Sequence, residues 1–337
     1  MASILVVNAG SESLKLSVVA PDEATTKLDS LEAAPDVEAV AHRVVHGGPL
    51  FCAPVLIDDA VELELEGLAE LAPLHNTPAL AAIREARKLF PGLPQVAVFD
   101  SAFHATIQDE ASTYALSSQL RGWGIRRYGF HGLSVQWASE QVPASRLVVC
   151  HLGGGCSVTA VRDGRSVDTT MGFTPLEGVP MATRPGSVDP GALIYLLRHH
   201  LTLDALDHAL ELESGLAGLS GLSGDVRELE RSDAPGAKLA LDVFAYRVAA
   251  AIGAMAVALH GLDALVFTAG IGENSASVRK NVCDRLGFLG IELDQRANGS
   301  GGRDATISAS GSAVRIVVVD AREDLVAARA ARKLLKI

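Results

Sequence analysis

A chain of 337 residues, 48% of them hydrophobic and 20% charged, has the composition of a globular protein with about two domains. Its formal net charge of -11 gives no general positive field, so neither nucleic acid nor an anionic membrane is expected as a partner. The four cysteines lack C-x-x-C spacing, which predicts reduced thiols in a cytoplasmic protein and gives no zinc site.

The first predicted feature is a pair of strands, residues 3–7 and 15–19, both rich in Val, Ile and Leu. The connection from Asn8 to Leu14 is wider than a two-residue hairpin and offers an amide, a glycine and two hydroxyl groups, with Lys15 after it. These groups can hold phosphate oxygens and a hydrated metal ion, or they can fill an ordinary turn. No G-K-[ST] follows, so a Walker-type nucleotide site is excluded. The opening residues also do not match a secretory signal.

A cation lies within the next apolar strand. Residues 20–37 are polar and predict a surface connection, after which Arg43 stands in the run 40–45, before two glycines. A buried arginine is costly unless it meets an anion. Arg43 is therefore either half of a structural ion pair or a clamp for a carboxylate or phosphate.

Helices and a buried strand follow. Residues 58–72 have helical spacing, the segment 71–78 breaks that helix, and Pro78 is predicted to start a second helix that ends before Pro91. The strand 95–99 then leads into Asp100. Catalytic acids in open α/β sheets commonly lie at such carboxyl ends. Six of the ten histidines lie between residues 42 and 151, without the spacing of a zinc site.

Three glycines, 153–155, connect two apolar segments, 147–150 and 158–161. This pattern predicts strand, turn and strand. Glycines leave the N–H groups of such a turn open to an anion, or the segment is an ordinary hairpin with an irregular connection. The long loop 171–186 follows and carries Arg184. A loop of this length with no regular structure is often functional.

The later half alternates helices and strands. Helices are predicted at residues 192–199 and 203–212, then a loop at 214–224 and a long apolar helix that ends at 259. Its apolar run is too short to span a bilayer, so the helix is predicted to be buried. A strand at 265–268 enters a glycine-containing turn, and a last strand at 316–319 precedes a terminal helix. Because a strand, glycine turn and strand begin each half of the chain, we predict two related α/β lobes with ligand between them.

Several motifs run in order along nearly the whole chain. They are NAGSESLK (8–15), HRVVHGG (42–48), LAPLHN (71–76), VAVFDSAFH (96–104), RRYGFHG (126–132), HLGGGCS (151–157), SVDTTMGFTPLEG (166–178), FTAGIGENS (267–275) and GIEL (290–293). By these motifs the chain resembles the acetate and butyrate kinase family, within the sugar kinase, Hsp70 and actin superfamily. The resemblance implies an α/β fold of two ribonuclease H-like lobes with the active site in the cleft between them. Residues 1–101 and 325–337 would form the first lobe, and residues 102–324 the nucleotide-binding and dimerising second lobe.

The resemblance also implies a function: a cytoplasmic, homodimeric phosphotransferase that reversibly transfers a phosphoryl group from ATP to acetate by in-line attack, with Mg²⁺ or Mn²⁺, giving acetyl phosphate and ADP. The implied catalytic residues are Arg43, Asp100, His131 and Arg184. The implied substrate-binding residues are Arg43, Val45, Leu74, His75, Phe130 and Pro175. The implied cofactor-binding residues are Asn8, Ser11, Ser13, Lys15, His151, Gly153, Gly154, Gly155, Asp225, Val226, Arg227, Gly270, Ile271, Gly272 and Asn274. The implied metal-binding residues are Asn8, Asp100 and Glu323.

The chain departs from the family pattern at three places. Gly154 replaces the usual asparagine of the second glycine turn, Arg322 adds a cation before Glu323, and the segment 16–42 is shorter than usual, which is expected to remove strands and a helix from the first lobe. Three alternatives stay open beside acetate kinase activity: a kinase for propionate or another short-chain acid, a kinase that uses pyrophosphate, and a catalytically silent nucleotide-binding protein.

Overall fold

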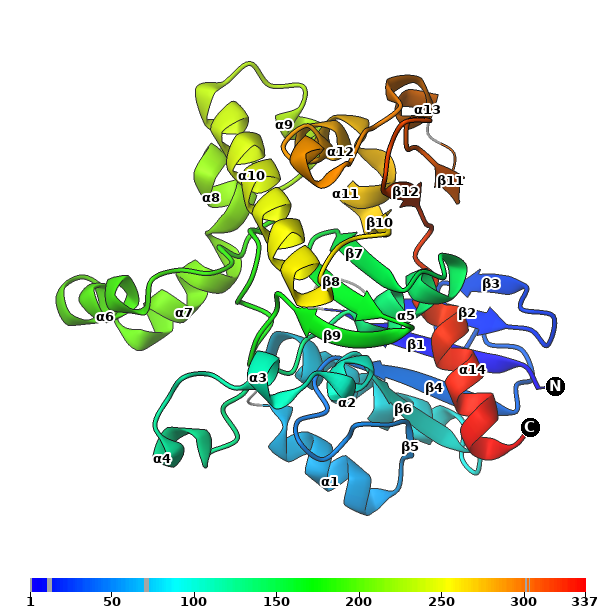
Figure 1. The fold of residues 1–337 in the computed structure, drawn as a ribbon. Helices are drawn as coiled ribbons and strands as arrows, with labels where there is room; N and C mark the ends of the chain where they lie inside the picture. The colour runs from blue at the N-terminus through cyan, green and yellow to red at the C-terminus, as the bar shows by residue number, and fades with distance from the viewer. Residues whose placement is uncertain (1, 11–13, 70–72, 301, 303) are drawn as a thin grey trace.

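The computed structural model describes residues 2–10, 14–69, 73–300, 302 and 304–337, without the side chains of residues 73–75. Within these residues the chain forms two six-stranded sheets, one in each lobe (Figure 1). The first contains β1 (Ile4–Ala9), β2 (Leu14–Val19), β3 (Thr25–Leu28), β4 (Ala39–Val44), β5 (Val55–Leu56) and β6 (Gln95–Phe99). The second contains β7 (Arg146–Leu152), β8 (Cys156–Arg162), β9 (Arg165–Thr169), β10 (Ala264–Thr268), β11 (Ala305–Thr306) and β12 (Arg315–Val318).

The two sheets have the same topology. The order β3-β2-β1-β4-β6-β5 of the first sheet is repeated by β9-β8-β7-β10-β12-β11 in the second. In each sheet the first three strands are antiparallel neighbours, and two later strands run parallel to the first. The prediction of two related α/β lobes is therefore confirmed. Ligands in open sheets bind at the carboxyl ends of the parallel strands, and these ends are topologically equivalent in the two sheets.

Helices cover both faces of each sheet. The helices are α1 (Asp59–Gly67), α2 (Pro73–Leu89), α3 (Asp109–Ser112), α4 (Ser118–Arg121), α5 (Gly132–Gln141), α6 (Pro190–His199), α7 (Leu203–Leu212), α8 (Gly215–Ser220), α9 (Val226–Leu229), α10 (Pro235–Leu259), α11 (Ala269–Asn274), α12 (Ala276–Cys283), α13 (Gln295–Ser300) and α14 (Glu323–Leu335). In the first lobe α14 packs on the face with Ile4 and Val6, and α2 packs on the opposite face. In the second lobe α10 and α12 share one core with the sheet, and α5 packs on the other face.

Two of these helices cross between the lobes. Helix α5 follows the last strand of the first sheet but packs on the second sheet, through Val135 and Ala138. Helix α14 follows the last strand of the second sheet but packs on the first. The two helices also contact each other. Each sheet is thus covered by a helix that follows the strands of the other sheet. The contact between these two helices holds the lobes side by side.

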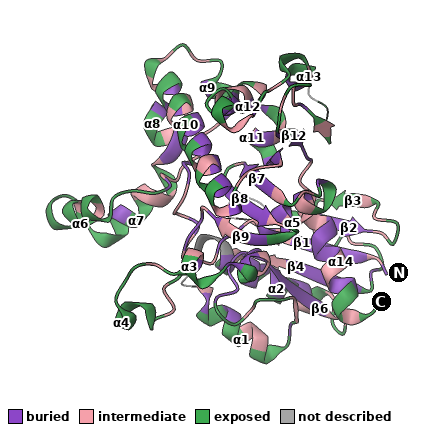
Figure 2. Ribbon diagram, viewed as in Figure 1, coloured by how far each residue is buried: buried purple, intermediate pink, exposed green. Residues whose placement is uncertain are grey.

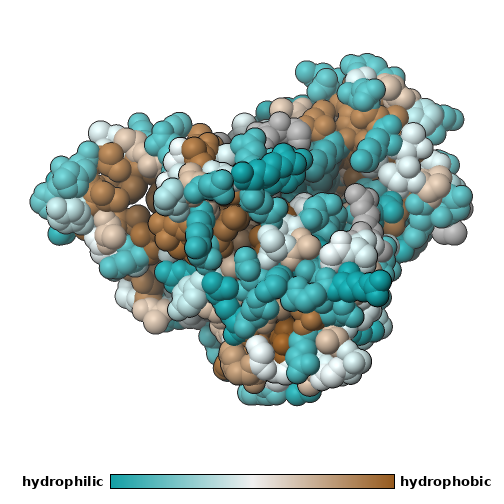
Figure 3. Space-filling model, turned by 90° about the horizontal axis from the view of Figure 1, so that it is seen from above, coloured by the Kyte–Doolittle hydropathy of each residue, from teal (hydrophilic) through white to brown (hydrophobic). Residues whose placement is uncertain are grey.

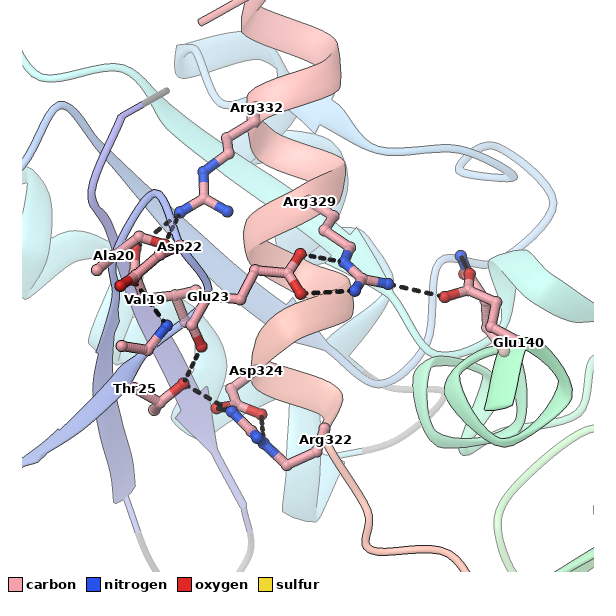
Figure 4. A network of polar contacts seen from close by, with 12 residues as sticks. Val19, Ala20, Asp22, Glu23, Thr25, Glu140, Arg322, Asp324, Arg329 and Arg332 are labelled. Carbon is pink, nitrogen blue, oxygen red and sulfur yellow. Dashed lines mark hydrogen bonds and ion pairs between the residues drawn. The ribbon is translucent and has the colours of Figure 1, made fainter. Parts of the chain in front are cut away.

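Ion pairs on α14 hold it to its neighbours (Figure 4). Arg329 donates to both carboxylate oxygens of Glu23, at 2.6 and 2.7 Å, and to Glu140 of α5 at 2.9 Å. Arg332 is buried and donates to the carbonyl oxygen of Ala2 at 2.8 Å. One helix therefore links the β2–β3 turn, the start of the chain and α5.

Helix α10 is the one helix among the described residues that is long and apolar enough to cross a membrane by length and composition. Phe244, Val248 and Ile252 on this helix are fully buried in the core of the second lobe. One face of the helix is therefore buried against the sheet, as predicted from the sequence, while Leu239, Tyr246 and Val257 are exposed.

The structure corrects some predicted elements. Residues 20–37 contain the edge strand β3, whose polar, partly exposed side chains give no apolar pattern. Helix α2 starts at Pro73, so Pro78 lies inside it and does not begin it. The predicted loop 214–224 contains the short helix α8. The shortened segment keeps six strands in the first sheet, and the connection 29–38 between β3 and β4 has neither helix nor strand.

Candidate active site

Polar side chains follow the carboxyl ends of the parallel strands of the first sheet. Asn8 of β1 and Arg43 of β4 are paired in register, and Asp100 follows β6 directly. The Nε atom of Arg43 donates to the two carboxylate oxygens of Asp100 at 3.0 and 3.1 Å, and Nη2 donates to Oδ2. The Nη1 atom donates to Oδ1 of Asn8 at 3.0 Å. The structure shows Arg43 in an ion pair with Asp100, and its role as a clamp for a carboxylate or phosphate stays a prediction.

This ion pair is shielded from solvent, with side-chain exposures of 12% for Arg43 and 0% for Asp100. Burial raises the pKa of the Asp100 carboxyl, against the lowering effect of the Arg43 guanidinium. Burial by itself lowers the pKa of Arg43, but the carboxylates of Asp100 and Glu323 outweigh it and raise that pKa. The guanidinium is therefore a permanent cation at the end of the sheet.

A second carboxylate reaches this centre from the last helix. Glu323 is the first residue of α14, and its Oε2 atom accepts from Nδ2 of Asn8 at 3.1 Å and lies 3.9 Å from Nε of Arg43. Burial raises the pKa of Glu323, but the charges of Arg43 and Lys15, with the hydrogen bond from Asn8, outweigh this effect and lower it below its ordinary value. Glu323 is thus held as an anion beside Asn8.

The extra cation at position 322 is directed elsewhere. The Nε atom of Arg322 donates to Oδ1 of Asp324 at 3.1 Å, and Nη2 donates to Oγ1 of Thr25 at 2.7 Å (Figure 4). These contacts tie the start of α14 to β3. The charge that departs from the family pattern is neutralised by Asp324.

The backbone at the start of α5 is unusually tight. His131 has φ 60°, in the left-handed region that is unfavourable for a residue with a Cβ atom. The N–H of Gly132 donates to the carbonyl oxygen of Asp100 at 2.9 Å, and a Cβ atom at Gly132 would lie 2.0 Å from that oxygen. Glycine is therefore required at position 132, and this close approach places the backbone of His131 beside Asp100.

Two imidazoles stack in the centre of the site. The rings of His131 and His151 lie 4.0 Å apart with 19° between their planes. Nδ1 of His131 is 3.0 Å from Oγ of Ser157, and Nδ1 of His151 is 2.8 Å from Oγ of Ser134. These hydroxyl contacts orient both rings. Neither serine was predicted as a site residue, although Ser157 closes the HLGGGCS motif.

Burial keeps some of the histidines uncharged. It lowers the pKa of each of four buried histidines from 6.5 to about 4, so all are neutral at pH 7. These buried histidines are His42, His46, His104 and His151. Of them, His151 is the one stacked on His131 in the site.

The second predicted arginine lies across the glycine turn. A Cβ atom added at Gly155 would lie 3.1 Å from Nε2 of His131 and 3.8 Å from Nη2 of Arg184. The N–H of Ala182 donates to the carbonyl oxygen of Gly154 at 3.1 Å, which ties the Arg184 loop to the turn. An imidazole, a guanidinium and a turn without side chains thus surround one small space, which is suited to an anion.

An apolar wall adjoins this space. Val45 and Phe130 are buried, at 4% and 1% exposure, in one hydrophobic cluster that spans the two lobes. Pro175 is also buried, and its carbonyl oxygen accepts from Nη1 of Arg184 at 3.2 Å. The loop that carries Pro175 is held by Arg127, whose Nη1 atom donates to three backbone carbonyls and whose Nη2 atom donates to Glu177 at 2.9 Å.

The remaining predicted residues lie in the turn after β10 and in α9. A Cβ atom at Gly153 would lie 3.9 Å from the backbone nitrogen of Gly270, so the glycine turn adjoins the turn after β10. Asn274 donates to the carbonyl oxygen of Gly270 at 2.8 Å, and Asp225 caps α9 by accepting from the N–H of Arg227 at 2.9 Å. Ile271 and Gly272 continue α11, and Val226 is buried in α9.

The structure therefore joins most predicted site residues by direct contact. Lys15 is exposed on β2, near enough to act on the charge of Glu323. Ser11 and Ser13, and the side chains of Leu74 and His75, lie outside the described residues, so their roles in the site stay predictions.

Known proteins share this sequence and fold. A model of the acetokinase family matches residues 23–329. An acetate kinase from Synechococcus sp. is 49% identical over 317 residues, which are 91% of this chain and 79% of the relative. A propionate kinase from Francisella tularensis is 34% identical, with a TM-score of 0.90 over 98% of this chain and 99% of that one. An acetate kinase from Entamoeba histolytica is 31% identical, with a TM-score of 0.90 over 99% and 100% of the two chains. With the two-lobe fold and the motifs, these matches show that the chain belongs to the acetokinase family.

Proposed function

We propose that this protein is an acetate kinase, which transfers a phosphoryl group reversibly between ATP and acetate. The observation that carries the proposal is the space at Gly155, where the imidazole of His131 and the guanidinium of Arg184 converge. Across the stacked histidines stands the second cation, Arg43, with carboxylates beside it. Phosphoryl transfer needs alignment and neutralisation of spread negative charge, and this arrangement supplies both.

In the proposed reaction the acetate carboxylate attacks the γ-phosphorus of ATP in line, and ADP leaves. Arg43 and Arg184 hold the carboxylate and the transferring group from two sides, and His131 stabilises the equatorial oxygens. Because a carboxylate is already a nucleophile, no strong general base is needed. Asn8 and Lys15, with Ser11, Ser13 and the turn 153–155, line the path of the phosphates.

The site fits a magnesium ion, or Mn²⁺ in its place. Asn8, Asp100 and Glu323 offer oxygen donors, which these ions prefer, and two carboxylates with waters and substrate phosphates are a usual Mg²⁺ environment. Within the described ranges, three or more His, Cys, Asp or Glu side chains do not gather as a complete metal cage. The ion, when bound, would neutralise phosphate charge. Asp100 and Glu323 would hold it through its waters.

Acetate is the proposed acceptor because Val45, Phe130 and Pro175, which match the small apolar pocket of the family, are all buried. A propionate kinase among the similar structures makes propionate the second candidate. One methylene group is worth about 1 to 3 kcal/mol of discrimination. We expect kcat/KM to decrease from acetate to propionate to butyrate, and Val45→Ala to shift the preference toward propionate about 10-fold. A wild-type preference for propionate would reassign the substrate.

ATP is the proposed donor because Gly270 lies beside the glycine turn, and Asp225 and Arg227 match the nucleotide side of the family pattern. The test is formation of acetyl phosphate, trapped as the hydroxamate, with Mg-ATP or with pyrophosphate as donor. We expect product with Mg-ATP alone. Product with pyrophosphate would support the pyrophosphate alternative, and no product at high enzyme concentration would support the silent nucleotide-binding protein.

A homodimer is proposed from the exposed arm α6–α7, which projects from the second lobe (Figure 1). Helix α6 has no buried residue, as Figure 2 shows, although Ile194 and Tyr195 are large and half-exposed. Apolar side chains gather on this side of the molecule in Figure 3. We expect Tyr195→Glu to yield monomers in light scattering, and Leu63→Glu, on the exposed face of α1, to leave the dimer intact. A monomeric wild type would remove this proposal.

We further propose the division into a lobe of residues 1–101 and 325–337 and a lobe of residues 102–324, because α14 packs on the first sheet. Limited proteolysis should cut between the two proposed lobes before it cuts within their sheets. Cleavage within β7 or β10 as the first event would argue against this division.

A cytoplasmic location is proposed from the free cysteines at positions 52, 150, 156 and 283, three of them buried.

A further inference from the structure

A buried carboxylate from the arm faces the second arginine of the site. We propose that Glu211, near the end of α7, is a positioning residue that orients the guanidinium of Arg184 for phosphoryl transfer. The proposal rests on the proposed kinase function and adds a residue that neither the motifs nor the comparisons indicate.

The first observation concerns the three sides of the guanidinium. Nη1 of Arg184 donates to the carbonyl oxygen of Pro175 at 3.2 Å. Nε lies 3.6 Å from Oε2 of Glu211. Nη2 lies on the side of Gly155, 3.8 Å from the position of an added Cβ atom. Pro175 and Glu211 therefore fix two sides of the planar group, and the third is directed to the space beside His131.

The second observation is the burial of this pair. The exposed fractions of the side chains are 12% for Arg184 and 18% for Glu211. The Oε2 atom of Glu211 is buried and has no hydrogen-bond partner among the described residues. Burial raises the pKa of Glu211, against the lowering effect of Arg184, and Asp207 raises it further. A buried carboxylate oxygen without a donor is costly, so the charge of Arg184 is its main compensation.

The distance of 3.6 Å leaves this contact slightly longer than a hydrogen bond. Contacts in sites without ligand often tighten when substrate is bound. A small rotation of Arg184 toward its substrates would bring Nε–H within donating distance of Glu211. The carboxylate would then restrict the guanidinium to the orientation that the transferring group needs.

The third observation is that the arm and the arginine loop are joined. The hydroxyl of Thr183 donates to the carbonyl oxygen of Glu211 at 2.7 Å, and the N–H of Ser214 donates to the carbonyl oxygen of Thr183 at 2.9 Å. Gly215 has φ +60°, and a Cβ atom there would lie 2.6 Å from the carbonyl oxygen of Arg184. These contacts make α7 and the Arg184 loop one unit, so Glu211 has a fixed position relative to the arginine backbone.

The test compares Glu211→Gln, which keeps the shape and removes the charge, with Glu213→Gln. Glu213 is on the same arm, is 64% exposed and pairs with His208, so it is a matched control. We expect Glu211→Gln to lower kcat about 10-fold with an unchanged KM for ATP, because only the orientation of Arg184 is affected. The control should stay within about 2-fold of wild type.

A double-variant cycle separates positioning from general structural damage. If Glu211 acts through Arg184, Glu211→Gln adds no further loss to an Arg184→Ala enzyme. Equal loss in both backgrounds, or unchanged kcat in Glu211→Gln, would overturn the proposal. If Glu211→Gln does not fold, Glu211→Asp, which keeps the charge and draws it back, is judged by the same cycle. An inactive wild type would instead refute the kinase function itself, so the two failures are distinguishable.

Discussion

A single methyl group at Gly155 tests the central geometry of the site. In Gly155→Ala the new methyl would lie 3.1 Å from Nε2 and 3.3 Å from Cε1 of His131. It would also lie 3.8 Å from Nη2 of Arg184, and so would occupy the space that we assign to the transferring phosphoryl group. The backbone at Gly155 is not in the left-handed region, so alanine introduces no conformational strain.

The size of the effect follows from these distances. Ordinary contacts between such atoms begin near about 3.5 Å, so the imidazole or the turn must move by roughly 0.4 Å. Since a misplacement of about 1 Å can lower a rate about 100-fold, this shift should lower kcat about 10-fold. Exclusion of the phosphoryl group should lower kcat/KM further, toward about 100-fold. The free energy of unfolding should change by less than about 1 kcal/mol.

The assay is initial-rate formation of acetyl phosphate as the hydroxamate, with chemical denaturation measured on the same samples. The matched control is Gly253→Ala in α10, where an added Cβ atom has no neighbour within 4 Å. We expect this control to retain wild-type kcat. Full activity in Gly155→Ala would show that the space between His131 and Arg184 is not where the phosphoryl group is transferred.

Further predictions concern the arginine, the departing glycine and pH. Arg184→Ala should lower kcat by about 100- to 1000-fold while calorimetric ADP affinity stays nearly constant, and unchanged turnover would remove Arg184 from the site. In Gly154→Asn the new side chain has open space, and its amide should lower the KM for acetyl phosphate by up to about 10-fold. An unchanged KM would show that the amide does not contribute to binding. The buried histidines have folded-state pKa values of about 4, below the ordinary 6.5, so the unfolded chain binds more protons between these values and stability falls as pH falls. Each buried histidine should lower the free energy of unfolding by about 1 to 2 kcal/mol between pH 7 and pH 5. An unchanged urea midpoint between pH 7 and 5 would contradict this.

Helices and strands with a clear pattern of apolar residues were predictable from the sequence. Strands that form only through hydrogen bonds to a neighbouring strand were not. Helix α10 and the buried strand β6 have long apolar runs that match their observed positions. The edge strands β3 and β11 contain few apolar residues, because one side of each faces solvent. Their strand structure depends on hydrogen bonds to distant neighbours, which no local pattern encodes.

The site shows the same division. Asp100 was predictable because a buried strand leads into it, and the glycine turn because three consecutive glycines separate two apolar strands. The role of Arg43 stayed open in the sequence because its partner Asp100 is 57 residues away. Glu211 gave no signal, since one glutamate on an amphipathic helix resembles any solvated residue until the fold brings it to Arg184.

Because α14 crosses to the first sheet, that sheet can be covered only after the strands of the second sheet have been translated. Strands β7 to β12 are complete by Val318, so the second sheet can form before residues 323–335 are translated. The face of the first sheet with Ile4 and Val6 stays uncovered until α14 emerges, and Glu323 reaches Asn8 in the same step. The lobe that is translated first is therefore finished last, when Glu323 joins Asp100 at the end of the first sheet.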